Sequence, residues 1–345
     1  MATPLRVALI GYGLGGSAFH APFIAATDGL ELAAIVTSDP ARAAAARSRY
    51  PRAPIRDRAE RVWRSAGDYD VAVIATPNRT HVPLAMAALD AGLHVVVDKP
   101  LAATAAEARA LIEHARVRER VLTVYQNRRW DGDFLTVRKL IAAGELGDVH
   151  RFESRFERWR PELKPGWRQD ADPAAAGGVL YDLGAHLIDQ ALVLFGPVTD
   201  VYAEVNRVRA GAEVDDDTFI ALTHASGVRS HLWMSLAAAA EGPRFRVLGR
   251  RGAFTRHGVD PQEARLRGGA DPARDDLGSE PAAGWGILTD GNEERRVPTE
   301  AGDYGAFYTL LVRAIREGGP LPVDPLESVS GLEIIEQARG QLPRK

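Results

Sequence analysis

Short apolar runs alternate with helical patterns along the first third of the chain. The runs fall at residues 5–10, 32–37, 70–76, 94–97 and 121–125. Between them, apolar residues recur every three or four positions, as on one face of a helix. This alternation predicts a parallel sheet with helices on both faces, so residues 1–125 are expected to form a doubly wound Rossmann domain of the α/β class.

Beyond residue 125 the pattern changes to alternation of apolar and polar positions. It marks strands at residues 149–160, 198–206, 218–224, 228–235 and 245–248. Strands of this kind bury one face and leave the other in water, which is typical of a large, mostly antiparallel open sheet. Residues 126–345 are therefore expected to form an α+β domain for substrate binding and oligomerisation.

Four helical patterns accompany these strands, at about residues 134–143, 177–195, 304–317 and 326–338. The last two are candidates to pack back on the first domain. Residues 258–286 are rich in Gly, Pro, Ala and Asp. We expect an irregular insertion there, with room for a short hairpin.

Composition narrows the class of protein. The 345 residues carry a formal net charge of −3, which gives no electrostatic reason to expect binding to nucleic acid or to an anionic membrane. The absence of cysteine excludes disulfides and zinc–thiolate sites, and we expect no bound metal. The sequence has no apolar run long enough to span a bilayer and no signal-peptide pattern, so we expect a cytoplasmic protein.

A glycine-rich motif follows the first apolar run directly. Gly11, Gly13 and Gly16 form G-x-G-x-x-G, with Leu14 inside the motif. Gly11 permits the tight turn, Gly13 lets the backbone approach a pyrophosphate, and Gly16 allows the helix to pack closely on the strand. Its position between a strand and a helix favours a dinucleotide site over a simple glycine-rich turn.

The end of the second strand bears on the choice between NADP and NAD. NAD-binding domains usually place an acidic residue here, on the ribose 2′-hydroxyl. This chain has Thr37 and Ser38, with Arg42 shortly after, a set that suits a 2′-phosphate better. Asp39 could still serve an NAD ribose, so NADP is the preferred cofactor and NAD stays open.

Polar residues also follow the third strand. Thr76, Pro77 and Asn78 lie at its carboxyl end, and His81 opens the next helix. Ligands of doubly wound sheets bind outside the carboxyl ends of the strands, so these residues are candidates to line the cofactor. For His81, a purely structural place in the first helical turn is the stronger alternative.

Lys99 stands at the carboxyl end of the fourth strand. Pro100 follows it and disfavours helical backbone angles at Lys99, which fixes the direction of the side chain. A lysine held at the edge of a buried sheet is suited to proton relay. The alternative is a surface lysine in a turn.

The stretch 177–190 reads GGVLYDLGAHLIDQ and carries a row of titratable groups. At helical spacing Asp182, His186 and Asp189 fall on one face, beside an apolar stripe that runs from residue 183 to residue 194. An imidazole with a carboxylate one turn away suits proton transfer. The alternative is an ordinary solvated helix face with i, i+4 pairs.

These motifs together resemble the Gfo/Idh/MocA oxidoreductases. The resemblance rests on residues 11–16, 76–78 with His81, 98–100 and 177–190, and it extends over essentially the whole chain. The sequence looks most similar to the branch that contains NADP-dependent scyllo-inositol dehydrogenases. One departure is Asp98, which stands where the family has glutamate in a Glu-Lys-Pro motif and leaves Lys99 in register.

The resemblance implies hydride transfer between a nicotinamide, NADP or NAD, and a carbinol carbon of a polyol or sugar. Lys99, Asp182 and His186 then form the catalytic set. His186 is the first choice for the base, Asp182 orients it or binds a hydroxyl, and Lys99 binds the reacting oxygen. Which of the lysine and the histidine accepts the proton stays open, and Asp189 is either structural or in contact with substrate.

Further residues are placed by the same resemblance. Trp167 and Arg168 match a pair that reaches the cofactor in some members. Tyr125, Asn127 and Arg128 are expected to line a hydroxyl-rich substrate pocket together with Lys99, Asp182 and His186. The family also implies a homodimer or homotetramer.

Two other functions fit the same resemblance. Some relatives are NAD-dependent glycosidases, but their glycine- and histidine-rich signatures are absent from this sequence. Others are non-catalytic regulators that bind a dinucleotide, and these tend to lose the lysine or the histidine. This chain keeps Lys99 and His186, which favours the dehydrogenase.

Overall fold

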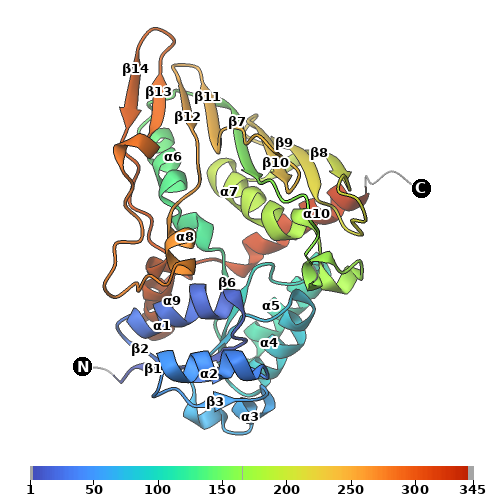
Figure 1. The fold of residues 1–345 in the computed structure, drawn as a ribbon, viewed down its shortest axis with the longest axis vertical. Coiled ribbons are helices and arrows are strands. Elements are labelled where there is room, and N and C mark those ends of the chain that lie inside the picture. Colours follow the sequence, from blue (N-terminus) through green and yellow to red (C-terminus); the bar gives the residue numbers. More distant parts are fainter. Residues whose placement is uncertain (1–2, 165, 341–345) are drawn as a thin grey trace. The chain divides into compact units, whose positions relative to one another are not determined.

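The computed structural model in Figure 1 describes residues 3–164 and 166–340. The chain forms two compact units, each built from separate segments. The first unit comprises residues 1–127, 262–277 and 304–329, and the second comprises residues 128–261, 278–303 and 330–345.

The first unit is built on a six-stranded sheet in the order β3-β2-β1-β4-β5-β6. Every neighbouring pair of strands is parallel. The strands are β1 (Leu5–Ile10), β2 (Leu30–Val36), β3 (Ile55–Arg56), β4 (Val71–Ile74), β5 (His94–Asp98) and β6 (Leu122–Tyr125). This strand order defines the doubly wound dinucleotide-binding fold, so the predicted Rossmann domain is confirmed.

Helices cover this sheet because its central strands are buried on both faces. All four residues of β4 and of β6 are buried. The α-helices of the unit are α1 (Ala21–Ala26), α2 (Pro40–Arg49), α3 (Glu60–Trp63), α4 (His81–Asp90), α5 (Ala105–Val117), α8 (Gln262–Arg267) and α9 (Gly305–Glu317). Shorter helical turns are η1 (Gly15–His20), η2 (Ala66–Asp68) and η3 (Asn78–Thr80).

The second unit is built on an eight-stranded sheet in the order β14-β13-β12-β11-β7-β10-β9-β8. Only the β7–β10 pair is parallel. The strands are β7 (Val149–Glu157), β8 (Val198–Asn206), β9 (Asp217–His224), β10 (Arg229–Ser235), β11 (Phe245–Gly249), β12 (Ala253–Arg256), β13 (Gly286–Thr289) and β14 (Glu294–Val297). The predicted large, mostly antiparallel sheet is confirmed.

Helix α7 (Ala185–Phe195) packs on β7 and β10 and covers the middle of this sheet. It continues from the π-helical turn η7 (Leu180–Gly184). The other helices are α6 (Gly132–Ala142), η5 (Trp167–Gln169), η6 (Pro173–Ala175) and η8 (Ala282–Gly284). Turn η4 (Asn127–Trp130) and helix α10 (Pro325–Gly340) contribute residues to both units.

The units differ from the domain boundaries expected from the sequence. The expected second domain, 126–345, includes residues 262–277 and 304–329, which the structure assigns to the first unit. In that unit α8 packs against η1, and α9 packs against α1. The helix expected at residues 304–317 was a candidate to pack on the first domain, and in the structure it is α9 of the first unit. Residues 262–277 were not expected there.

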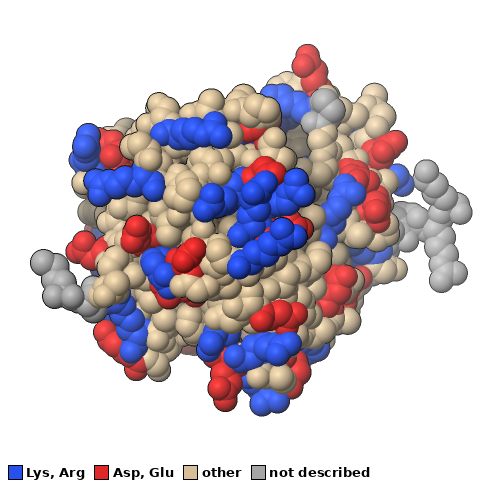
Figure 2. Space-filling model, turned by 90° about the horizontal axis from the view of Figure 1, so that it is seen from below, with Lys and Arg blue, Asp and Glu red and all other residues tan. Residues whose placement is uncertain are grey.

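Residues Pro173–Phe195 are long enough and apolar enough on average to cross a membrane, although they form no continuous apolar run, yet 72% of their most apolar window is buried inside the protein. It is therefore a core helix. On the face drawn in Figure 2, Lys and Arg side chains lie among Asp and Glu side chains, and neither sign covers the face. This mixed surface agrees with the small net charge.

Candidate active site

Of the three glycines in the motif after β1, Gly13 is the one with open space beside it. Gly11 has φ +101°, and a Cβ there would lie 2.4 Å from the carbonyl oxygen of Ala75. A Cβ on Gly16 would lie 2.0 Å from the oxygen of Gly11. Both glycines are therefore required by the protein's own packing. At Gly13 the nearest atom is 3.8 Å away, so this is the open position that a pyrophosphate could approach.

Arg42 lies beside this open position. Its Nη1 is the atom that lies 3.8 Å from a Cβ built on Gly13. Asp39, by contrast, caps α2 by accepting a hydrogen bond of 2.9 Å from the backbone N–H of Arg42. The Arg42 guanidinium also stands 3.8 Å from the Asp39 carboxylate. Thr37 accepts a long hydrogen bond of 3.4 Å from the Asp39 N–H, and Ser38 lies between them.

The residues after β4 form a hydrogen-bonded turn. Thr80 donates to the hydroxyl of Thr76 and to the carbonyl of Pro77, both at 2.7 Å. His81 is 1% exposed, with Nδ1 2.8 Å from the oxygen of Pro100 and Nε2 2.9 Å from the oxygen of Thr76. Burial lowers the pKa of His81. The His81 ring therefore links the ends of β4 and β5, which is the structural alternative predicted for it. Asn78 is buried in the same turn.

Lys99 directly follows β5, as the sequence predicts. Its backbone N–H donates to Oδ1 of Asp98 at 2.8 Å, and the other Asp98 oxygen lies 3.6 Å from Nε2 of His20. Burial opposes the charge of Asp98, but the nearby His20 and Lys99 hold the pKa of this carboxyl below its usual value. His20 in turn bonds through Nδ1 to the Tyr308 hydroxyl at 2.6 Å. Asp98, the residue before Lys99, is thus held in place through His20 and Tyr308 of the core.

Tyr125 does not line a pocket. It is 1% exposed, and its hydroxyl donates to the carbonyl oxygen of Phe19 at 2.9 Å. Its ring packs 4.3 Å from His20 and 4.8 Å from Phe307. Tyr125 was expected in the substrate pocket, but its side chain packs in the core of the first unit.

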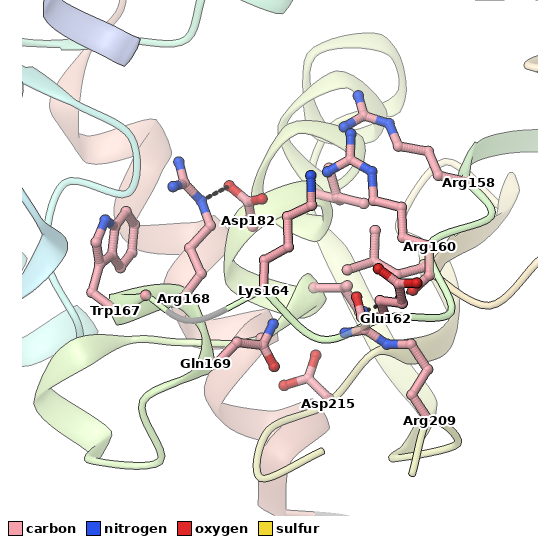
Figure 3. Close-up of a pocket in the computed structure, with 15 residues that line it drawn as sticks. Arg158, Arg160, Glu162, Lys164, Trp167, Arg168, Gln169, Asp182, Arg209 and Asp215 are labelled. Atoms are coloured by element: carbon pink, nitrogen blue, oxygen red, sulfur yellow. Dashed lines mark hydrogen bonds and ion pairs between the residues drawn. The ribbon is translucent and has the colours of Figure 1, made fainter. Parts of the chain in front are cut away.

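In the second unit Asp182 lies in the π-helical turn before α7. Its side chain is 33% exposed, and its Oδ1 lies 3.2 Å from Nε of Arg168 (Figure 3). The Arg168 guanidinium also stacks 4.3 Å over the ring of Trp167. The Trp167–Arg168 pair, carried over as a cofactor contact, therefore holds one of the candidate catalytic carboxylates.

His186 and Asp189 occupy different surroundings from Asp182. His186 is 7% exposed, and the Phe156 ring meets it edge-on at 6.4 Å. Asp189 accepts two hydrogen bonds from Arg129, at 2.6 Å and 2.8 Å. Asp182, His186 and Asp189 were expected on one face of a helix, but their surroundings differ. Asp189 is a partner in a buried ion pair.

Arg128 and Asn127 are both buried. Arg128 is 7% exposed, reaches Asp131 at 3.3 Å and stacks 4.7 Å over the ring of Phe156. Its carbonyl accepts a hydrogen bond of 2.8 Å from Gln190. Arg128 thus belongs to a buried network under α7 and is not an open pocket-lining residue. Asn127 is 9% exposed, and its contact with substrate stays a prediction.

The two glycines before η7 make room for other parts of the chain itself. A Cβ on Gly178 would lie 2.0 Å from Oδ1 of Asp215, and one on Gly177 would lie 2.7 Å from the oxygen of Asp170. Asp215 accepts a hydrogen bond of 2.7 Å from the N–H of Leu180. At Gly177 and Gly178 the close approach is therefore to this buried carboxylate and to nearby backbone.

A cavity of about 200 Å³ opens beside Asp182, and several of its residues were not predicted. They include Arg158, Arg160 and Lys164, which follow β7 (Figure 3). A signal for them does exist in the sequence. Along β7 the charges occupy odd-numbered positions, and at Arg158 and Arg160 they change to even-numbered positions.

Comparison with family models covers both units. Residues 5–126 match the model described as an oxidoreductase family with an NAD-binding Rossmann fold. Residues 134–255 match the model of the GFO/IDH/MocA C-terminal domain. The two matches together cover more than half of the chain.

Full-length relatives support the same comparison. The oxidoreductase YdgJ of Escherichia coli is 40% identical, with 97% of this chain and 96% of the relative covered. The scyllo-inositol 2-dehydrogenase (NADP(+)) IolW of Bacillus subtilis is 36% identical, with 97% and 92% covered. The solved structure of the oxidoreductase yvaA from Bacillus subtilis has a TM-score of 0.92 at 35% identity, with 98% of this chain and 96% of that chain covered.

Proposed function

Because the chain belongs to the Gfo/Idh/MocA family of NAD(P)-binding oxidoreductases, we propose that it transfers hydride between NADP and a hydroxyl-bearing carbon of a polyol or sugar. One observation carries the proposal above the others. Asp182 is held by Arg168 at 3.2 Å beside a cavity, and the buried His186 follows one helical turn later. A carboxylate and an imidazole so arranged can bind and deprotonate a hydroxyl.

The bound nicotinamide would supply or accept the hydride, and the side chains would handle the proton. His186 would take the hydroxyl proton in the oxidation direction, since imidazole titrates near neutral pH. Asp182 would bind a hydroxyl or orient the ring. Lys99 would donate a hydrogen bond to the reacting oxygen, with Asp98 fixing the backbone at that point.

The preference for NADP rests on Arg42 and Asp39. Asp39 is engaged as the cap of α2 and faces Arg42, so it is less suited to a ribose 2′-hydroxyl. Arg42 lies beside the open Gly13 and offers a cation to a 2′-phosphate. The relative IolW is named for its use of NADP(+), which supports the same choice. We also propose that the chain assembles into a homodimer or homotetramer.

Lys99→Met and His186→Asn, measured separately, test the catalytic assignment. Turnover of a panel of inositols and sugars is followed by nicotinamide absorbance with NADP and with NAD. Each variant should lose about a hundredfold or more in kcat/KM on the best substrate. His224→Asn is the matched control, because this buried histidine of the second unit bonds to Gly196 and Ser230 away from the cavity.

The assignment fails if both variants keep nearly wild-type kcat/KM. Hydrolysis of a nitrophenyl glycoside that requires NAD would instead indicate a glycosidase. A protein that binds NADP but oxidises or reduces nothing in the panel would favour a dinucleotide-binding regulator. Melting temperatures of all variants separate these outcomes from loss of folding.

A further inference from the structure

The cavity beside Asp182 is lined by more cations than carboxylates. Its lining includes Arg158, Arg160, Lys164, Arg168 and Arg209, against the carboxylates Glu162, Asp182 and Asp215. All of these residues belong to the second unit. The cavity has a volume of about 200 Å³, enough for a small organic molecule.

Two of the arginines enter the cavity because the chain stays extended after β7. The N–H of Arg158 donates to Ser235 at 2.9 Å, and the N–H of Arg160 donates to Leu236 at 2.8 Å. The intervening Trp159 is 57% exposed and is absent from the lining. In Figure 3 the cationic ends of Arg158, Arg160 and Lys164 turn toward the same region. Like charges gathered in this way repel one another unless an anion lies between them.

Arg209 and Arg168 are balanced by carboxylates of the protein itself. Arg209 pairs with the buried Asp216 at 2.8 Å and also donates to the carbonyl of Arg160 at 3.0 Å. Arg168 pairs with Asp182 at 3.2 Å. Within residues 3–164 and 166–340, neither Arg160 nor Lys164 makes an ion pair. These two side chains are exposed at the rim and can reach a ligand.

The nearby carboxylates offset little of the remaining charge. Asp215 is buried and accepts the N–H of Leu180, and burial raises the pKa of its carboxyl. Burial therefore disfavours the charged form of Asp215, and Glu162, which also lines the cavity, is exposed as Arg160 and Lys164 are.

The cavity adjoins η7, the turn that leads into α7 and carries Asp182. Asp182 and Leu183 contribute to its wall. Phe156, two residues before Arg158 on β7, contacts His186 edge-on at 6.4 Å. An anionic group held by the arginines would thus lie on the same side of the sheet as the proposed base.

We propose that this cavity binds an anionic group of the substrate, so that the substrate is a sugar or polyol bearing a carboxylate or a phosphate. The inference rests on the proposed function, since it names the substrate class of the same site. Arg160 and Lys164 would hold the anion. Asp182 and His186 would then meet the hydroxyl-bearing part of the molecule.

Paired substrates test the proposal. Initial rates with NADP are compared for a hexose, the matching hexuronate and the matching hexose 6-phosphate. The wild-type enzyme should favour one of the two anions over the neutral sugar by about tenfold or more in kcat/KM, the value of a hydrogen-bonded charge. Arg160→Met and Lys164→Met should each reduce that ratio. Arg250→Met is the control, because Arg250 is 79% exposed and does not line the cavity.

A binding measurement separates this inference from the proposed function. Calorimetric titration of the wild-type protein and of the Arg160→Met/Lys164→Met double variant uses inorganic phosphate and the hexuronate, without cofactor and at constant ionic strength. Saturable binding that the double variant loses supports the anion site whether or not turnover is found. Turnover of neutral sugars with no anion preference and no anion binding overturns the inference and leaves the proposed function standing. A higher KM for NADP alone in the double variant would assign the cations to the cofactor and would also overturn it.

Discussion

At the scale of single residues, Arg42 is the side chain on which the proposed preference for NADP depends. Its guanidinium lies beside the one glycine of the loop that the packing leaves open, and the acidic residue nearby is used to cap a helix. A phosphate at the ribose 2′ position would gain a charge-assisted bond from Arg42 that a hydroxyl would not gain to the same degree. The proposed preference for NADP over NAD therefore depends on one cation, and a single substitution can test it.

Arg42→Ala should raise KM for NADP by about tenfold or more, because a hydrogen bond to a charged group contributes about 1.5–3 kcal/mol. KM for NAD should stay within about twofold, since NAD has no 2′-phosphate. Steady-state kinetics with both cofactors measure the effect. Arg47→Ala is the matched control, because Arg47 is exposed on the same helix. Equal losses with both cofactors would contradict a 2′-phosphate contact and would point to the shared pyrophosphate.

Residue types at strand ends and at helical spacing were enough to predict Lys99, Asp182 and His186 as candidates. The partners that hold such residues were not predictable, because Arg168 is fourteen positions from Asp182 and Arg129 is sixty from Asp189. These ion pairs depend on how distant segments pack. Tyr125 illustrates the same limit, since its place at the end of a strand does not tell which way its side chain points.

At the scale of elements, the entry to α7 is shaped by Gly178 and the turn η7. Gly178 has φ +95°, and a Cβ there would lie 2.0 Å from the carboxylate of Asp215. Asp215 in turn accepts the N–H of Leu180, at the start of η7. The position of Asp182 on this turn therefore depends on a glycine that lets a buried carboxylate reach the backbone.

Gly178→Ala should destabilise the protein through two effects. A side chain at positive φ costs about 1–2 kcal/mol, and the clash with Asp215 adds about 1–3 kcal/mol. Gly227→Ala is the matched control, since Gly227 has φ +86° but nothing within 4 Å of a Cβ. Denaturant unfolding monitored by circular dichroism should show a larger loss of unfolding free energy for Gly178→Ala. Equal losses for the two variants would mean that the carboxylate moves aside at no cost.

Elements with a clear period were predicted well, and short ones were not. Strands β7 to β11 follow the predicted ranges closely because apolar and polar residues alternate along them. Strands β12, β13 and β14 are four residues long each, and β14 buries only its last residue. So short a strand, paired at the edge of a sheet, carries little periodicity of its own. In the expected irregular insertion the structure adds helix α8 and turn η8, and the β13–β14 hairpin starts at its end.

At the scale of the whole molecule, one face of the eight-stranded sheet presents a row of aromatic side chains. Phe219 and Trp233 lie 5.0 Å apart, Tyr202 packs 6.4 Å from Phe219, and Arg155 stacks 3.8 Å over Trp233. Tyr202 is 53% exposed. In strand β10, Trp233 alternates with the buried Leu232 and Met234, so the row lies on the face opposite α7.

An exposed aromatic row on a sheet is suited to association with a second copy of the same face. We therefore expect a homo-oligomer that buries this face, and Trp233→Glu should shift it toward monomer, since an unpaired carboxylate would be buried in the interface. Light scattering coupled to gel filtration measures the mass. Val117→Glu is the control, because Val117 is 62% exposed on α5 in the first unit. A wild-type protein that runs as a monomer at micromolar concentration, or a Trp233→Glu variant that keeps the wild-type mass, would show that this face is not the interface.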